Sequence, residues 1–105
     1  MDQFKLEIYI PESHFSMLQR ALQSVEAGHI GNYDNCLSYS RVKGTWRPLQ
    51  GASPYNGTEG TVSEAEELKV EVNVSSDKLN STLRAIRTIH PYEEARHKCH
   101  PTLCA

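Results

Sequence analysis

The chain lacks an excess of positive charge and any long apolar run, the usual signs of nucleic-acid-binding and membrane proteins. Among its 105 residues, 11 are Lys or Arg and 13 are Asp or Glu, which gives a net charge of -2. A nucleic-acid partner would need a clustered basic face, so the sequence predicts no such partner. The N-terminus also lacks a positive segment followed by an apolar one. We therefore expect a cytoplasmic protein with no membrane association.

Cysteine is scarce, with only Cys36, Cys99 and Cys104 in the chain. An odd number without a disulfide-framework spacing predicts reduced thiols. Together with His97 and His100, the last two cysteines form a possible zinc or copper site, because thiolate and imidazole are ligands that these metals favour. Their spacing matches no regular zinc-finger pattern, and a chain terminus often frays. A metal site and a tail without a role both stay open.

Apolar residues recur along the chain with two periods. A period of two is typical of strands with one buried face, and recurrence every three or four positions is typical of helices with one buried face. The expected elements are strands at residues 4–10, 36–43 and 68–74, a weak strand from Tyr92, and helices at residues 11–28 and 76–89.

This order predicts an α+β fold, a ferredoxin-like βαββαβ sandwich with a four-stranded antiparallel sheet and two helices on one face. We expect another subunit to cover the other face. The domain is expected at residues 1–95, followed by a C-terminal tail of uncertain order at residues 96–105. Between Gly44 and Gly60, four glycines and two prolines predict a long irregular loop. Loops of that length are usually functional or form contacts.

Residues 90–94, HPYEE, place an imidazole and two carboxylates where the second helix must end. Pro91 cannot continue a helix, and the helix dipole favours the protonated form of His90. If a strand follows, Glu93 and Glu94 point to opposite faces, so one of these carboxylates needs a partner. A structural ion pair or helix-ending turn is one interpretation, and a ligand or metal site is the other.

Four short segments carry a resemblance to a known family. They are residues 28–36 (GHIGNYDNC), 47–54 (RPLQGASP), 57–60 (GTEG) and 90–94 (HPYEE). In this order they resemble the PII/CutA-like domain inserted into some Nif-three-like proteins, often named type 2 GTP cyclohydrolase I, and its stand-alone relatives of the YqfO type. The resemblance covers roughly residues 3 to 95. It implies a PII/CutA-like fold that assembles as a homotrimer, and it does not imply the hydrolase activity of the larger proteins.

The resemblance also implies where ligands would bind. CutA-like proteins share a His-Pro-Tyr-Glu element and are linked to divalent metal tolerance, which makes His90, Glu93 and Glu94 candidate ligands for zinc or copper. PII-like trimers bind small effectors between subunits, and glycine backbone N–H groups can face an anion. The expected ligand-binding residues are Gly31, Tyr33, Gly51, Pro54, Gly57, His90 and Tyr92. The chain departs from the family at Ala95, where a proline is usual, and at Asn56, which replaces an apolar residue.

We therefore expect a non-enzymatic, homotrimeric sensor or binding module that holds a metal ion or a small anion at subunit interfaces. A metal-dependent hydrolase with His90 and Glu93 as ligands or base is one alternative. A purely structural or partner-docking domain is another. The sequence has no phosphate-loop or Gly-x-Gly-x-x-Gly pattern, so a nucleotide is only one of the anions that this site would accept.

Overall fold

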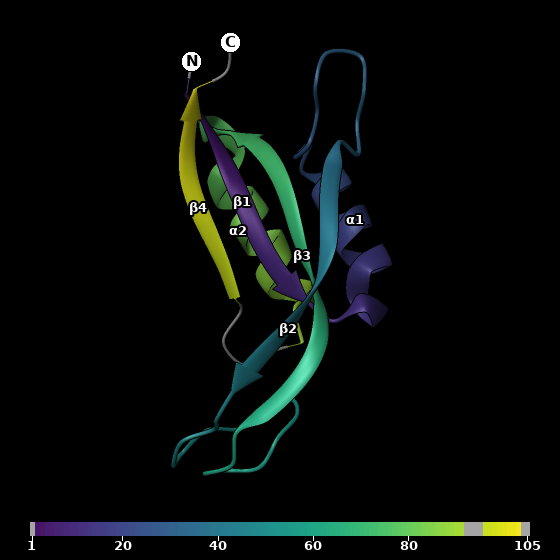
Figure 1. The fold of residues 1–105 in the computed structure, drawn as a ribbon. Helices are drawn as coiled ribbons and strands as arrows, with labels where there is room; N and C mark the ends of the chain where they lie inside the picture. The colour runs from purple at the N-terminus through teal and green to yellow at the C-terminus, as the bar shows by residue number, and fades with distance from the viewer. Residues whose placement is uncertain (1, 92–95, 104–105) are drawn as a thin grey trace.

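The computed structural model describes residues 2–91 and 96–103, which form a four-stranded sheet and two helices (Figure 1). The sheet order is β2-β3-β1-β4, and every neighbouring pair is antiparallel. This order confirms the ferredoxin-like prediction. The elements are β1 (Asp2–Ile10), α1 (Phe15–Ser24), β2 (Leu37–Trp46), β3 (Ser63–Ser75), α2 (Leu79–Ile89) and β4 (Arg96–Leu103), with 3-10 turns at Glu12–His14 and Ser76–Lys78 before the two helices.

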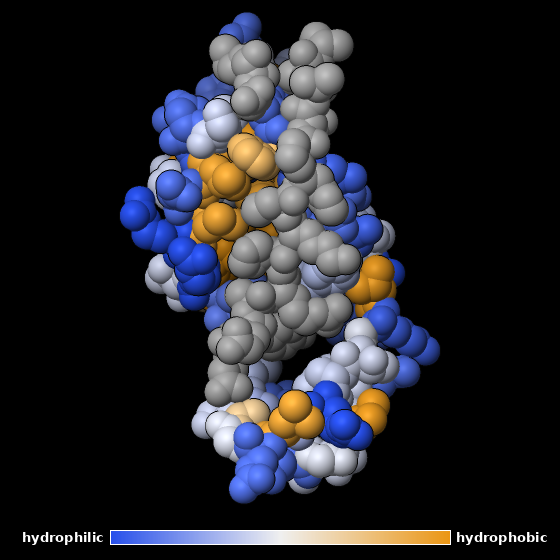
Figure 2. Space-filling view, turned by 90° about the vertical axis from the view of Figure 1, so that its left-hand side faces the viewer, coloured by the Kyte–Doolittle hydropathy of each residue, from blue (hydrophilic) through white to orange (hydrophobic). Residues whose placement is uncertain are grey.

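The core lies between the sheet and the helices, which both cover the face turned away from the viewer in Figure 1. Alternate β1 residues, Leu6 and Ile8, are fully buried and lie opposite Val72 and Val70 of β3. The helices contribute Leu18, Leu22 and Ile86 to the same cluster. Figure 2 shows apolar side chains at the margin of this core as an orange strip beside hydrophilic surface residues. Period-two alternation in β1 and the three- or four-residue spacing in the helices therefore meet in one core.

The last described strand lies further along the chain than the sequence pattern indicated. It begins at Arg96, inside the segment assigned to a tail, and pairs with β1 from Tyr9↔Arg96 to Asp2↔Leu103. Tyr92, where we expected it to start, lies outside the described residues. β4 is an edge strand, so it needs backbone partners on one side only, and an edge strand tolerates a proline such as Pro101.

Strands β2 and β3 both extend further than the sequence pattern indicated. The pairing of β1 with β3 ends at Ile10↔Leu68, whereas β2 and β3 continue together as far as Trp46↔Ser63. We call residues 42–67, which include the connecting loop 47–62, the arm. In Figure 1 the arm projects from the bottom of the sheet, which we call the lower end; residues 25–36 lie at the upper end.

Candidate functional site

His90 fixes the end of α2 to the end of β1. Its backbone N–H donates to Ile86 at 2.9 Å, and its Nε2 lies 2.6 Å from the backbone oxygen of Tyr9. A carbonyl oxygen only accepts, so Nε2 carries the hydrogen in this arrangement. The residue is 8 % exposed. His90 is therefore first an anchor between two elements, and a metal would have to bind elsewhere on the ring or displace this bond.

The metal prediction depends on residues that surround His90 in sequence. Tyr92, Glu93 and Glu94 lie outside the described residues, as does Cys104. Among the side chains that the structure describes, those of residues 3–91, no group of three or more His, Cys, Asp or Glu is placed to hold a metal ion. His97, Cys99 and His100 belong to β4, at the register positions of Ile8, Leu6 and Lys5. Metal binding at His90 with Glu93 and Glu94 stays a prediction.

The loop of the arm has a defined internal structure, although it carries no regular strand or helix. Trp46 donates its Nε1–H to the backbone oxygen of Asn56 at 2.9 Å, and Gly60 donates its N–H to Pro48 at 2.8 Å. Gly57 has a φ of 110°, and a Cβ on it would lie 2.8 Å from Trp46 Nε1. Gly57 therefore has a structural role besides its expected role in anion binding, because only glycine leaves room for the indole.

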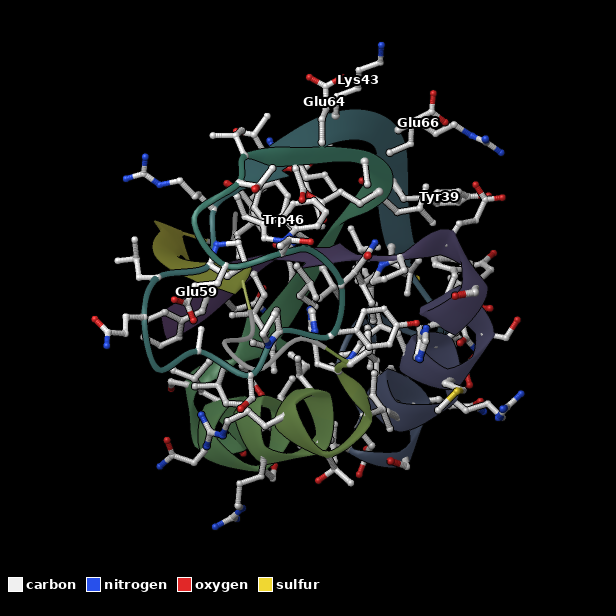
Figure 3. All side chains as sticks on the ribbon, turned by 90° about the horizontal axis from the view of Figure 1, so that it is seen from below. Tyr39, Lys43, Trp46, Glu59, Glu64 and Glu66 are labelled. Atoms are coloured by element: carbon white, nitrogen blue, oxygen red, sulfur yellow. The ribbon has the colours of Figure 1, made fainter. Side chains whose placement is uncertain are left out.

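Tyr55 joins this loop to the start of the first helix. Its ring meets His14 edge-on, with the ring centroids 6.3 Å apart. His14 follows closely on the end of β1, so the loop, β1 and α2 all reach the lower end of the protomer. Figure 3, seen from below, shows the loop spread across this end with Trp46 at its base. The structure thus brings the expected loop residues Gly51, Pro54 and Gly57 to the same end as His90.

Gly31 and Tyr33 lie at the other end of the molecule. They belong to a turn closed by reciprocal backbone hydrogen bonds between Ile30 and Tyr33, both at 2.9 Å. The preceding Gly28 donates its N–H to Asn73, near the upper end of β3. From Asn73 down to Ser63 the strand rises about 33 Å, at roughly 3.3 Å per residue. Gly31 and Tyr33 therefore cannot share a site with the loop of the same protomer, and a common site would need two protomers.

The sheet face opposite the helices carries a network of charges that the sequence analysis did not identify. Lys5 pairs with Glu71, and Lys69 pairs with Glu7 at 3.3 Å. Glu7 and Glu71 are direct neighbours across β1 and β3, so each carboxylate is balanced by a diagonal lysine. The hydrogen bond and the charge of Glu7 raise the pKa of Lys69. The charged residues are visible at the polar positions of β1 and β3 in the sequence. Their pairing could be recognised only once the register of the two strands was known.

Comparison with known proteins identifies the family. No family model matches the chain. It is 37% identical over 98 residues to a GTP cyclohydrolase 1 type 2 homolog of Halalkalibacterium halodurans, covering 93% of this chain and 26% of that protein. A protein of the same name from Mycobacterium tuberculosis is 41% identical over 90 residues, covering 86% of this chain and 24% of the relative. The chain thus spans about a quarter of the length of these relatives.

Solved structures agree with this assignment. A Bacillus cereus protein related to NIF3 superposes with a TM-score of 0.84 at 30% identity, covering 96% of this chain and 26% of the other. CutA from Archaeoglobus fulgidus gives a TM-score of 0.70 at 18% identity, covering 100% of this chain and 87% of the other. GlnK from B. subtilis gives 0.67 at 18% identity, with coverages of 97% and 86%. The last two show the fold alone. The chain therefore belongs to the Nif-three-like family, as a domain with the PII/CutA-like fold.

Proposed function

We propose that this domain is a non-enzymatic, homotrimeric binding module that holds a small anion or a metal ion where subunits meet at the lower end. The observation that carries the proposal is that a pre-shaped loop and a buried imidazole lie at the same end of the protomer. The loop is held by Trp46 and Asn56, and His90 is fixed to Tyr9. A site whose groups are already positioned spends little free energy on ordering when its ligand binds.

Two structural neighbours support a ligand of this class. B. subtilis GlnK has been solved as an ATP complex, and that structure superposes on this chain with a TM-score of 0.65. The CutA of Archaeoglobus fulgidus is named a periplasmic divalent cation tolerance protein. One neighbour therefore binds a phosphate-bearing anion, and the other is connected with divalent metals. Both ligand types belong in the test of this domain.

The surface of the protomer supports self-association. On the arm, Leu49, Tyr55 and Val62 are 64%, 57% and 64% exposed, which leaves apolar side chains in water at a projecting segment. The charged sheet face offers Lys5, 43% exposed, and Glu71, 31% exposed, as groups that can also pair with another copy. An apolar projection beside alternating charges is the composition of an interface with a defined register.

Light scattering after size-exclusion chromatography tests the assembly. We expect one species of three times the 11.9 kDa chain mass. Replacing Leu49 and Val62 by Ser should shift it towards the monomer, because these exposed side chains contribute nothing to the protomer core. A monomeric wild-type chain at micromolar concentration would contradict the trimer.

A thermal-shift panel of zinc, copper, nucleotides and inorganic phosphate tests the ligand. A ligand that prefers the folded state raises the melting temperature, and His90→Gln should abolish that rise. Gln retains an amide donor for the Tyr9 oxygen, so the variant is expected to fold. His29→Gln, at the upper end, is the matched control and should keep the rise. If no compound shifts the wild-type protein, the domain is a structural or partner-docking unit instead.

A further inference from the structure

A groove between the start of α1 and the outer edge of β2 lies apart from the charged face and from the His90 anchor. It encloses about 420 Å³, within the range of small-molecule sites. Its floor is Leu68, which is 3% exposed. One wall comes from the first helical turns and the other from three successive β2 residues, Tyr39, Ser40 and Arg41. Figure 3 shows Tyr39 on the side of the sheet next to α1.

The groove has an aromatic wall. Phe15 and Tyr39 pack with ring centroids 4.6 Å apart and planes tilted by 46°. Tyr39 remains 55% exposed, so this pair leaves much of the tyrosine uncovered. An uncovered aromatic face beside a buried leucine is a surface on which a flat apolar body gains burial and ring contacts.

A cation, Arg41, lies on the same β2 wall as Tyr39, and its side chain is 67% exposed. Arg41 uses one nitrogen, Nη2, for both carboxylate oxygens of Glu12, at 3.0 and 3.1 Å. Within the described part of the chain, its other guanidinium N–H groups have no hydrogen-bond partner, and neither do the hydroxyls of Ser16 and Ser40. Glu12 thus orients the guanidinium while leaving donors that a second carboxylate can use.

From this arrangement we infer that the groove binds a small organic anion with a flat apolar body, of the aromatic monocarboxylate class. The carboxylate takes the unused edge of Arg41 and the hydroxyl of Ser16. The ring lies on Tyr39 above Leu68. This site is distinct from the one proposed where subunits meet, because none of the residues that line it belongs to the loop of the arm.

The inference predicts that neutralising Glu12 strengthens ligand binding. If the Arg41–Glu12 pair served only to hold the groove together, neutralising Glu12 would weaken ligand binding. Glu12→Gln instead removes a negative charge that repels the bound carboxylate and keeps an amide oxygen for Arg41, so it should tighten benzoate binding by about two- to fivefold, the range of an exposed ion pair. Arg41→Gln should weaken it about tenfold, and so should Tyr39→Ala, because one loses charge-assisted hydrogen bonds and the other the ring contact.

A benzoate titration of the full chain, monitored by amide NMR, tests the inference. We expect saturable shifts at Tyr39, Ser40 and Arg41, and none of that size with benzylamine or acetate, which lack the charge or the ring. Arg84→Gln removes an exposed arginine on α2 and should leave the titration unchanged. Equal shifts with acetate, stronger binding of benzylamine, or no saturable shift at these residues would overturn the inference. Binding that survives Arg41→Gln unchanged, or that weakens in Glu12→Gln, would do so as well.

Discussion

The two halves of β3 pass through different surroundings. From Leu68 to Val74 the strand has β1 on one side and β2 on the other along most of its length, and its alternate residues are buried under the helices. From Ser63 to Glu67 it pairs with β2 alone, and only Glu67 is buried. One continuous strand therefore belongs first to a body of two layers, sheet and helices, and then to a solvated two-stranded ribbon.

The difference shows that the two regions are stabilised by different interactions. In the body, apolar side chains leave water, and that burial is the main favourable term of folding. In the arm, order comes from specific contacts: the Trp46–Asn56 hydrogen bond, the Gly60–Pro48 hydrogen bond and the ring contact of Tyr55. Since the arm contributes little apolar burial, its shape can change without loss of the fold. We expect it to be the region adapted for contacts with ligands and other subunits.

The largest expected effect comes from a substitution in the body. Ile8 of β1 is fully buried, so Ile8→Ala should lower the free energy of unfolding by about 2–5 kcal/mol, the cost of a large-to-small change in a core. Val62→Ala, at a position 64% exposed on the arm, should change it by less than about 0.5 kcal/mol. Urea unfolding at a fixed protein concentration measures both. Similar losses in the two variants would erase the contrast between body and arm.

A smaller and local effect is expected at Gly57. An alanine there combines a φ of 110° with a Cβ 2.8 Å from Trp46 Nε1, so it should displace the indole and cost the arm about 1–3 kcal/mol. Amide hydrogen exchange should show protection lost in residues 46–60 and kept in β1. Trp46 is the only tryptophan in the chain, so its fluorescence reports on the loop alone. Its emission should shift to the red as the indole is displaced.

Gly51→Ala is the matched control for that variant. Its φ of 92° is also positive, but nothing lies within 4 Å of the added Cβ. It should therefore carry the backbone strain without the steric conflict, and the Trp46 emission should stay in place. A red shift as large in Gly51→Ala as in Gly57→Ala would mean that backbone strain, and not the indole contact, orders the loop.

The contrast between body and arm also explains which structural predictions succeeded. An element with one buried face carries apolar residues at a regular spacing, so β1, α1 and α2 were predictable from that spacing. The lower half of β3 carries Glu64 and Glu66, and β4 carries Pro101 among polar residues, so neither pattern shows a strand. Both are held by backbone pairing on one side, which leaves no apolar period.

The candidate site was predictable in composition and not in position. Glycine motifs and His90 were found because their residue types are unusual, but grouping them in one site ignored the end of the sheet at which each of their loops lies. Helix α1 carries the chain from the lower end to the upper one, so the turn with Gly31 is separated from the loop with Gly57 by the length of the sheet. The partner of His90, a backbone oxygen, leaves no trace in the sequence at all.

The smallest effect should appear on the charged face of the body, and only at alkaline pH. The pKa of Lys69 is raised by Glu7, above the ordinary value of 10.5, so the folded state holds this proton more tightly than the unfolded chain does. The stabilisation is fully present below that value and is lost as the pH rises through the folded pKa. Wild type should therefore lose its advantage over Lys69→Met between neutral pH and pH values above 10.5, as judged by urea midpoints. Salt should shrink the difference, because the lysine is solvent-accessible.

Lys43→Met on the arm, where no ion pair joins Lys43 to another described residue, should show no such pH-dependent gap. If its gap equals that of Lys69→Met, the effect reflects net charge alone and not the pairing of β1 with β3.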